Sequence, residues 1–324
     1  MIALEKINKT FRVAKRQAGF RHAVKALFSR EYEIVRALSD VSFTIGDGEM
    51  VGYIGPNGAG KSTTIKIMCG VLTPESGACV IDGRTPWRER TAHVRDIGVV
   101  FGQRSQLWWD VPVIDSFELI RDIYKIGANQ YRRNLDELAE LLDLGELLKT
   151  PARNLSLGQR MRCEIAASLI HSPKTLFLDE PTIGLDAVSK IAVRKFIRKL
   201  NAEHRTTVIL TTHDMQDIEA LTERILLIGK GKILLDGSLD ELKRHSSDQK
   251  TLVVEYSGAM PAIPEGMALT EEKDGRFAVL LDPKTLSVSD AIVALAAQTE
   301  ILDVSVSGIS AEEMVAALYK EYQI

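Results

Sequence analysis

Short apolar runs alternate with amphipathic segments along the first three quarters of the chain. The runs are rich in leucine, β-branched and aromatic residues and are bounded by polar residues, as buried strands are. They cover Val41–Ile45, Met50–Ile54, Ile97–Phe101, Thr175–Leu178, Thr207–Thr211 and Arg224–Ile228. Because strands that alternate with helices build a parallel sheet, the pattern predicts an α/β fold.

A helix-rich insert of about residues 112–172 interrupts this alternation. Leucines recur in it at helical spacing, which indicates core packing rather than chemistry. They are Leu135, Leu138, Leu141 and Leu142. The insert therefore predicts a helical subdomain within a first domain of residues 1–245.

A second, smaller domain is expected over residues 246–324, after the polar stretch His245–Asp248. Its pattern predicts the order ββαβα and hence a small α/β domain. The expected strands are Thr251–Tyr256, Arg276–Leu281 and Ile301–Val306, and the expected helices are Val288–Ala297 and Ala311–Tyr322. Since it holds no catalytic constellation, we expect it to regulate the protein or to support dimerisation.

Residues of about 12–36 depart from the strand pattern and are interpreted as an insertion. Six residues within 12–30 are basic and none is acidic. Phe20, Val24, Leu27 and Phe28 share one face of a helix at this spacing. A basic amphipathic helix favours contact with a membrane surface or a partner protein. The alternative is a solvated insertion whose charges only maintain solubility.

Composition narrows the class of protein. At 324 residues the chain predicts about two domains, and its net charge of −3 argues against a nucleic-acid binder. Cys69, Cys79 and Cys163 lack C-x-x-C spacing, which favours buried, inert thiols in a reducing compartment. No apolar run approaches the ~18–20 residues that span a bilayer, and no signal peptide is expected at the N-terminus. Any membrane crossing is therefore expected from another chain.

A glycine-rich loop carries the strongest chemical signal. It fits G-x-x-x-x-G-K-[S/T] without a mismatch, and it lies between a predicted strand and a predicted helix at Thr63–Cys69. Such a loop points backbone N–H groups at phosphates, its lysine faces the β- and γ-phosphates, and its hydroxyl ligates Mg²⁺. The loop is Gly55, Pro56, Asn57, Gly58, Ala59, Gly60, Lys61 and Ser62, with Thr63 at the helix end.

Two carboxylates follow the apolar run Thr175–Leu178. At a strand end beside a phosphate loop, Asp179 is placed to hold Mg²⁺ through its waters. Glu180 is then placed to orient and polarise an attacking water, because a general base must reach the proton that it takes. Together with the phosphate loop, this pair predicts hydrolysis of a nucleoside triphosphate.

The run Leu155-Ser156-Leu157-Gly158-Gln159 precedes an apolar helix at Met161–Ile170, and its serine and glycine form an anion-binding helix end. The order of phosphate loop, L-S-x-G-Q, strand-D-E and a later histidine resembles the ABC-family ATPases. The resemblance covers about residues 1–245 and implies the ABC type of phosphate-loop NTPase fold, with ATP and Mg²⁺ as ligands. Leu157 stands where many members have glycine.

The resemblance implies further roles, residue by residue. Gln103 is similar to the glutamine that contacts Mg²⁺ and the attacking water, and His213 to the histidine that contacts the γ-phosphate. Asp186 resembles the aspartate that crosses to a partner subunit. Ser156, Gly158 and Gln159 of one copy then face the phosphate loop of a second copy, so a homodimer is expected.

The roles of four aromatic residues are left open by the sequence. Counting from the N-terminus favours Phe11 as the residue that stacks on adenine, whereas counting back from the phosphate loop favours Tyr32. Trp108 and Trp109 follow Gln103 and form either core or the wall of a groove for a transmembrane partner.

The function that follows is an ATPase subunit that docks on a separately encoded permease at the cytoplasmic face of the cell membrane. The chain is similar to type-2 exporter ATPases around Gln103, over Leu155–Arg162 and in the C-terminal region. This similarity favours export. The insertion also resembles the gate helix of polysaccharide exporters, which favours a large amphiphilic substrate. The alternatives are an importer ATPase, or a soluble ABC protein acting on ribosomes or nucleic acid.

Overall fold

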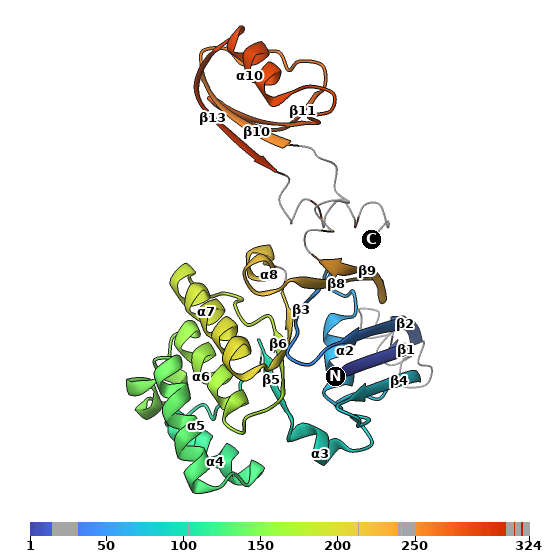
Figure 1. Ribbon diagram of the computed structural model, residues 1–324, viewed down its shortest axis with the longest axis vertical. Coiled ribbons are helices and arrows are strands. Elements are labelled where there is room, and N and C mark those ends of the chain that lie inside the picture. The colour runs from blue at the N-terminus through green and yellow to red at the C-terminus, as the bar shows by residue number, and fades with distance from the viewer. Residues whose placement is uncertain are drawn as a thin grey trace, which may run out of the picture. The chain divides into compact units, whose positions relative to one another are not determined.

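The computed structural model describes residues 1–14, 32–102, 104–212, 214–238, 241, 250–308, 314 and 319. Its contacts divide the chain into two compact units, Met1–Asp236 and Gly237–Ile324 (Figure 1). The sequence predicts the boundary near residue 246, which lies outside the described residues. Among the residues that are described, no helix is long and apolar enough to cross a bilayer.

A six-stranded sheet forms the centre of the first unit, with the strand order β5-β6-β7-β3-β8-β9. The β5–β6, β6–β7, β7–β3 and β3–β8 pairs are parallel, as the alternating pattern predicts. The strands are β3 (Met50–Ile54), β5 (Ile97–Phe101), β6 (Thr175–Asp179), β7 (Thr207–Thr211), β8 (Arg224–Gly229) and β9 (Lys232–Ser238). Because parallel strands end at the same edge, the loops after β3, β6 and β7 meet there.

The described helices of this unit pack near the sheet or form the helical subdomain (Figure 1). The packing contacts of α2 with β6 and of α8 with β3 place these two helices beside the strands that carry the site. The helices are α2 (Lys61–Met68), α4 (Val113–Tyr124), α5 (Ala128–Leu141), α6 (Leu157–Leu169) and α7 (Ala187–His204). Shorter helices are α3 (Arg90–Val94), α8 (Met215–Leu221), η1 (Gly145–Lys149) and η2 (Ala152–Asn154).

A second sheet of the same unit is antiparallel, with the order β2-β1-β4. It consists of β1 (Ile2–Ala14), β2 (Tyr32–Ile45) and β4 (Ser76–Ile81). Its inner residues join those of α2 and the parallel sheet in one buried cluster, which includes Leu4, Ile65 and Phe177.

The insertion is shorter than predicted. Residues 12–14 and 32–36 are strand, because they pair with each other in the β1–β2 hairpin, with Arg12 opposite Ile34 and Ala14 opposite Tyr32. Pairing supplies the strand structure here even though Ile34 is exposed, so the sequence shows no buried pattern. The predicted helix face of Phe20, Val24, Leu27 and Phe28 lies outside the described residues.

The second unit contains a four-stranded antiparallel sheet, in the order β11-β12-β10-β13. Its elements are β10 (Lys250–Ser257), β11 (Met267–Lys273), β12 (Arg276–Leu281), α10 (Val288–Ala296) and β13 (Glu300–Gly308). Alternate residues of β10 and β12, among them Leu252, Val254 and Val279, pack with Ala291 and Leu295 of α10.

The predicted order ββαβα lacks β11. In the structure, three strands and not two precede α10. This strand escaped the pattern because its residues are exposed or half-buried and largely polar. Pairing with β12 holds it in place. The predicted last helix at residues 311–322 falls almost entirely outside the described residues.

Candidate functional site

The glycine-rich loop joins the end of β3 to the start of α2, as predicted. Two of its glycines are required by space. A Cβ on Gly55 would clash with the carbonyl oxygen of Ile228, and a Cβ on Gly60 would lie 2.7 Å from the carbonyl oxygen of Ala37. Gly60 also has φ 113°, a conformation that residues with a side chain rarely adopt. The curled backbone therefore depends on these residue types.

Lys61 is the first residue of α2, and its ammonium group bends back over the loop. Its Nζ donates hydrogen bonds to the carbonyl oxygens of Gly55 at 2.5 Å and Pro56 at 3.2 Å. Burial lowers the pKa of Lys61, while the nearby charges of Glu180 and Asp179 oppose this effect. The Lys61 ammonium therefore lies near backbone carbonyls and carboxylates. A bound phosphate can replace the two carbonyl oxygens as acceptor of its hydrogen bonds.

Asp179, the last residue of β6, lies beside the loop. Its Oδ2 accepts a hydrogen bond from the Ser62 hydroxyl at 3.4 Å, and its Oδ1 accepts one from the Thr211 hydroxyl at 2.5 Å. A hydroxyl and a carboxylate are the hard oxygen donors that Mg²⁺ prefers, and Mg²⁺ takes its other ligands from water and phosphate. The donor set of Ser62 and Asp179 therefore fits Mg²⁺ bound with a nucleotide. Among the described residues, no cluster of three or more His, Cys, Asp or Glu side chains forms a separate metal cage.

Glu180 follows directly and has an unusual backbone. Its φ is 55°, in the left-handed region, and its backbone N–H donates to the carbonyl oxygen of Thr211 at 2.8 Å. Strained backbone of this kind costs about 1–3 kcal/mol and persists only where surrounding structure imposes it. The strain sits at the residue that the sequence predicts to be the base.

The segment Leu155–Gln159, named the signature segment here, leads into α6, the signature helix. Ser156 is the N-cap: its hydroxyl accepts from the Gln159 N–H at 3.2 Å, and its own N–H donates to Gln159 Oε1 at 2.9 Å. This capping box satisfies the N–H groups of Ser156 and Gln159. Ser156 and Leu157 are exposed, so the positive end of the helix dipole can still be approached by an anion. Gly158 packs against Ser189 of α7, and a Cβ on Gly158 would lie 2.9 Å from the Ser189 Cβ.

Asp186 caps the neighbouring helix α7. It accepts hydrogen bonds from the backbone N–H and the hydroxyl of Ser189, both at 2.9 Å, and these bonds lower the pKa of its carboxyl group. The sequence predicts for it only a contact with a partner subunit. Gln103 and His213, the other two residues predicted in catalytic roles, lie outside the described residues.

The chain that follows position 103 is held on the signature helix. Glu164 of α6 is buried and accepts hydrogen bonds from the Ser105 hydroxyl and from the Gln106 N–H, the latter at 2.9 Å. Burial raises the pKa of Glu164, and the hydrogen bond from Ser105 opposes this. A carboxylate in the middle of α6 thus joins the helix to the segment after Gln103.

Both candidates for adenine stacking lie on the β1–β2 hairpin. Phe11 is half-buried and has the Lys9 ammonium 5.6 Å from its ring centroid. Tyr32 is 53% exposed and pairs with Ala14 at the far end of the hairpin.

The two tryptophans after position 103 are surface residues, so the prediction of a core role is wrong. Trp108 and Trp109 are 58% and 50% exposed. The ring of Trp109 is 5.5 Å from the Arg160 guanidinium and lines a pocket between α6 and the segment of residues 104–109. The second alternative, that Trp108 and Trp109 form the wall of a groove for a transmembrane partner, stays a prediction.

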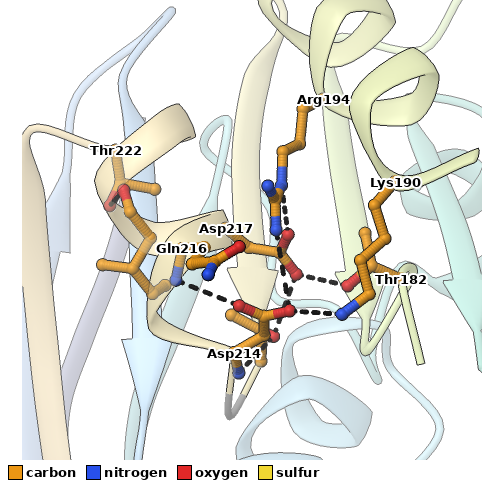
Figure 2. A network of polar contacts seen from close by, with 9 residues as sticks. Thr182, Lys190, Arg194, Asp214, Gln216, Asp217 and Thr222 are labelled. Carbon is orange, nitrogen blue, oxygen red and sulfur yellow. Dashed lines mark hydrogen bonds and ion pairs between the residues drawn. The ribbon is translucent and has the colours of Figure 1, made fainter. Parts of the chain in front are cut away.

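Sequence reasoning missed a partly buried ionic network between α7 and α8 (Figure 2). It centres on Asp214 and Asp217 at the start of α8, which contact Lys190 and Arg194 of α7. The spacing of two aspartates in the first turn of a helix was the available signal, because acidic residues favour that position. Their partners lie more than twenty residues away in the sequence.

Comparison with known proteins gives one family. The family described as ABC transporter matches residues 38–183, which include the glycine-rich loop, Asp179 and Glu180. The chain is 31% identical over 277 residues to Nod factor export ATP-binding protein I of Ralstonia nicotianae, a match that covers 84% of each chain. It is 32% identical over 230 residues to the probable sulfate/thiosulfate import ATP-binding protein CysA of Chlorella vulgaris, covering 71% of this chain and 96% of that one.

A solved structure supports the same relationship. It is a dimeric post-hydrolysis state of the ATP-binding cassette MJ0796 bound to ADP and Pi. The match has a TM-score of 0.62 at 27% identity and covers 74% of this chain and 99% of that one. The predicted α/β fold of phosphate-loop type is thereby confirmed.

Proposed function

Because this chain belongs to the ABC transporter ATP-binding proteins, which hydrolyse ATP to drive transport, we propose that it powers an exporter by closing as a homodimer on a separately encoded permease. The observation that carries the ATP-hydrolysing part of the proposal is the meeting of the glycine-rich loop with Asp179 and Glu180 at one sheet edge. The protein is then peripheral, at the cytoplasmic face of the cell membrane.

Within the site, each residue has one task. Lys61 binds the β- and γ-phosphates, and Ser62, Asp179 and Gln103 hold Mg²⁺, directly or through water. Bound Mg²⁺ neutralises charge on the phosphates. Glu180 orients the attacking water and accepts its proton, while His213 contacts the γ-phosphate. The new bond forms between the water oxygen and the γ-phosphorus, and ADP leaves with the bridging oxygen.

A second copy completes the site. The N-terminal end of α6, where Ser156 is exposed, Gln159 half-buried and Gly158 buried, would face the γ-phosphate bound to the other copy, and Asp186 would cross the same interface. The dimeric state of the MJ0796 cassette supports this arrangement. Phe11 stacks on adenine, because its ring is half-buried and fixed within the hairpin, whereas Tyr32 is exposed. Ligand binding then biases closure of the dimer, and hydrolysis reopens it.

Two observations support docking and direction. Exposed Trp108 and Trp109 offer an apolar surface next to position 103, which suits a helix of a permease. The match with the Nod factor export protein extends over 277 residues, beyond the ATP-binding unit, whereas the match with the import protein covers 230. This difference favours export, with import as the alternative. An amphiphilic substrate is favoured only by the resemblance of the insertion to the gate helix of polysaccharide exporters. The second unit regulates the dimer or stabilises it.

The test is an affinity pull-down of the Glu180→Gln protein from native membranes with ATP, followed by mass spectrometry. A multi-spanning membrane protein at near-equal stoichiometry supports the proposal. A Glu180→Gln protein that also carries Trp108→Ala and Trp109→Ala serves as the matched control and should lose the partner while still binding ATP. Recovery of ribosomal proteins or nucleic acid without a membrane protein would overturn the proposal.

A further inference from the structure

Asp217 is a completely buried carboxylate in the first turn of α8. It accepts hydrogen bonds from the hydroxyls of Thr182 and Thr212, the latter at 3.2 Å, and from Arg194 Nε at 2.5 Å. These donors come from three separate segments: the turn after β6, the end of β7, and α7 (Figure 2). One side chain therefore holds three parts of the chain together.

Two of these segments carry proposed catalytic residues. Thr182 lies two residues after Glu180, within the turn that follows the left-handed backbone of Glu180. Thr212 directly precedes position 213. The hydroxyls of both threonines converge on the same oxygen of Asp217, Oδ2. A shift of Asp217 would therefore move both segments.

The residue on the other side of position 213 is held as well. The Asp214 N–H donates to the Thr212 hydroxyl at 3.0 Å, and Lys190 Nζ donates to Asp214 Oδ2 at 2.5 Å. Arg194 Nη2 lies 3.6 Å from that same Oδ2. It is buried and, within the part of the chain that the structure describes, has no hydrogen-bond partner. Arg194 thus stands between the two carboxylates of Asp214 and Asp217.

Capping of α8 does not account for Asp217. Asp214 is already the N-cap, and its Oδ1 accepts from the Gln216 N–H at 3.0 Å. Burying a carboxylate is costly unless it is paired and hydrogen-bonded, and an apolar pair of similar volume is often at least as stable. What the carboxylate adds over an apolar side chain is direction, since its two oxygens fix the donors at defined positions.

We propose that Asp217 is a positioning residue for hydrolysis: it fixes the turn that carries Glu180 relative to the strand end that carries His213. The inference rests on the roles proposed above for those two residues. Correct placement of a base and of a phosphate contact matters because an error of about 1 Å can cost about 100-fold in rate.

The experiment removes one hydroxyl at a time in the full-length protein. Thr182→Val keeps the volume of the side chain but deletes its hydrogen bond to Asp217, whereas Thr182→Ser keeps the hydroxyl and deletes the methyl group. Thr222→Val is the matched control, because Thr222, the C-cap of α8, is also buried and its hydroxyl donates to the Ile218 carbonyl oxygen at 3.0 Å. For each variant, kcat and KM for ATP, the Kd for ATP and the melting temperature are measured.

We expect Thr182→Val to lower kcat about 10-fold or more, with KM and Kd unchanged within a factor of about 2. Thr182→Ser and Thr222→Val should keep the wild-type kcat. Thr212→Val should also lower kcat, and the double variant should lose less than the product of the two single losses, because both hydroxyls act through one carboxylate. Wild-type kcat in folded Thr182→Val and Thr212→Val overturns the inference, as does an equal loss in Thr182→Ser.

Measuring Glu180→Gln in parallel distinguishes failure of the inference about Asp217 from failure of the role proposed for Glu180. If Glu180→Gln is inactive and Thr182→Val is fully active, the inference about Asp217 fails alone. If Glu180→Gln hydrolyses ATP normally, the proposed role of Glu180 fails, and the inference fails with it.

Discussion

Ser62 and Asp179 are 117 residues apart in sequence, yet the hydroxyl of one lies 3.4 Å from the carboxylate of the other. Ser62 lies in α2, which follows β3, and Asp179 ends β6. The strands β3 and β6 are not neighbours, because β7 lies between them in the sheet. The first turn of α2 brings Ser62 across to the end of β6, and packing of α2 against β6 fixes the distance. The proposed Mg²⁺ ligands therefore depend on the placement of one helix.

Ser62→Ala should raise the Mg²⁺ concentration required for half-maximal ATPase activity by about 10- to 100-fold, because it deletes a hydroxyl ligand. Asp179→Asn should have an effect of the same order. A titration of ATPase activity with Mg²⁺ at fixed ATP measures it, and Ser42→Ala, in β2, serves as control. An unchanged Mg²⁺ requirement in Ser62→Ala would remove that residue from the metal site.

Glu180→Gln should bind ATP with wild-type Kd but lower kcat by about 100-fold or more, because an amide cannot accept the proton of the attacking water. Single-turnover hydrolysis and equilibrium ATP binding separate the two quantities. Glu140→Gln, at an exposed position of α5, is the matched control for loss of a carboxylate. Turnover within a few-fold of wild type would exclude Glu180 as the base.

Phe11→Ala should raise the KM for ATP about 10-fold, since stacking on a base contributes about 1–3 kcal/mol. Tyr32→Ala, on the same hairpin, should leave KM unchanged. Replacing ATP by GTP in both variants tests whether the contact is to the base. The reverse result would assign adenine stacking to Tyr32.

Replacing residues 15–31 by Asn-Gly should preserve folding and ATPase activity. Ala14 and Tyr32 are directly paired and antiparallel, and a two-residue Asn-Gly turn suits such a pair. The melting temperature should stay within a few degrees of that of the wild type. A large drop in melting temperature would mean that these residues also stabilise the sheet. If the variant keeps its ATPase activity but recovers no permease in the pull-down, the segment belongs to the docking surface.

The stability of the fold should decrease in alkali because of its buried cysteines. Burial raises the pKa of Cys79 and Cys163 to about 12 from 9.0. The unfolded chain then loses thiol protons first as the pH rises above 9, so the free energy of unfolding falls between about pH 9 and 12. Urea unfolding at pH 8.0, 9.0 and 9.5, below the range in which tyrosines add to the effect, measures the slope. Cys79→Ala should make the slope shallower, and an unchanged slope would contradict the assignment.

The parallel sheet was predictable because its strands are buried on both faces and read as apolar runs, Thr175–Leu178 being an example. Local signals also placed the glycine-rich loop and the helix start at Ser156. The outer strands were not predictable in the same way. Residues 32–36 and β11 are stabilised by pairing with a neighbour, which leaves no periodic burial in the sequence.

The network around Asp217 was invisible for a related reason. Thr182 and Asp217 are 35 residues apart, and neither residue type alone indicates a buried bond. Trp108 and Trp109 could be interpreted as core or as surface, because an aromatic pair in a loop carries no period. Only the folded chain shows them exposed.

Gly158 has one more consequence. Its missing Cβ provides the space in which Ser189 packs, while the same residue is proposed to face the ATP of a second copy. The residue at position 158 must therefore satisfy both the packing against position 189 and the proposed contact with ATP. A substitution at position 158 or 189 then requires a compensating substitution at the other position. Alanine at 158 should be found only with glycine at 189, so these two positions are expected to co-vary among the relatives of this chain.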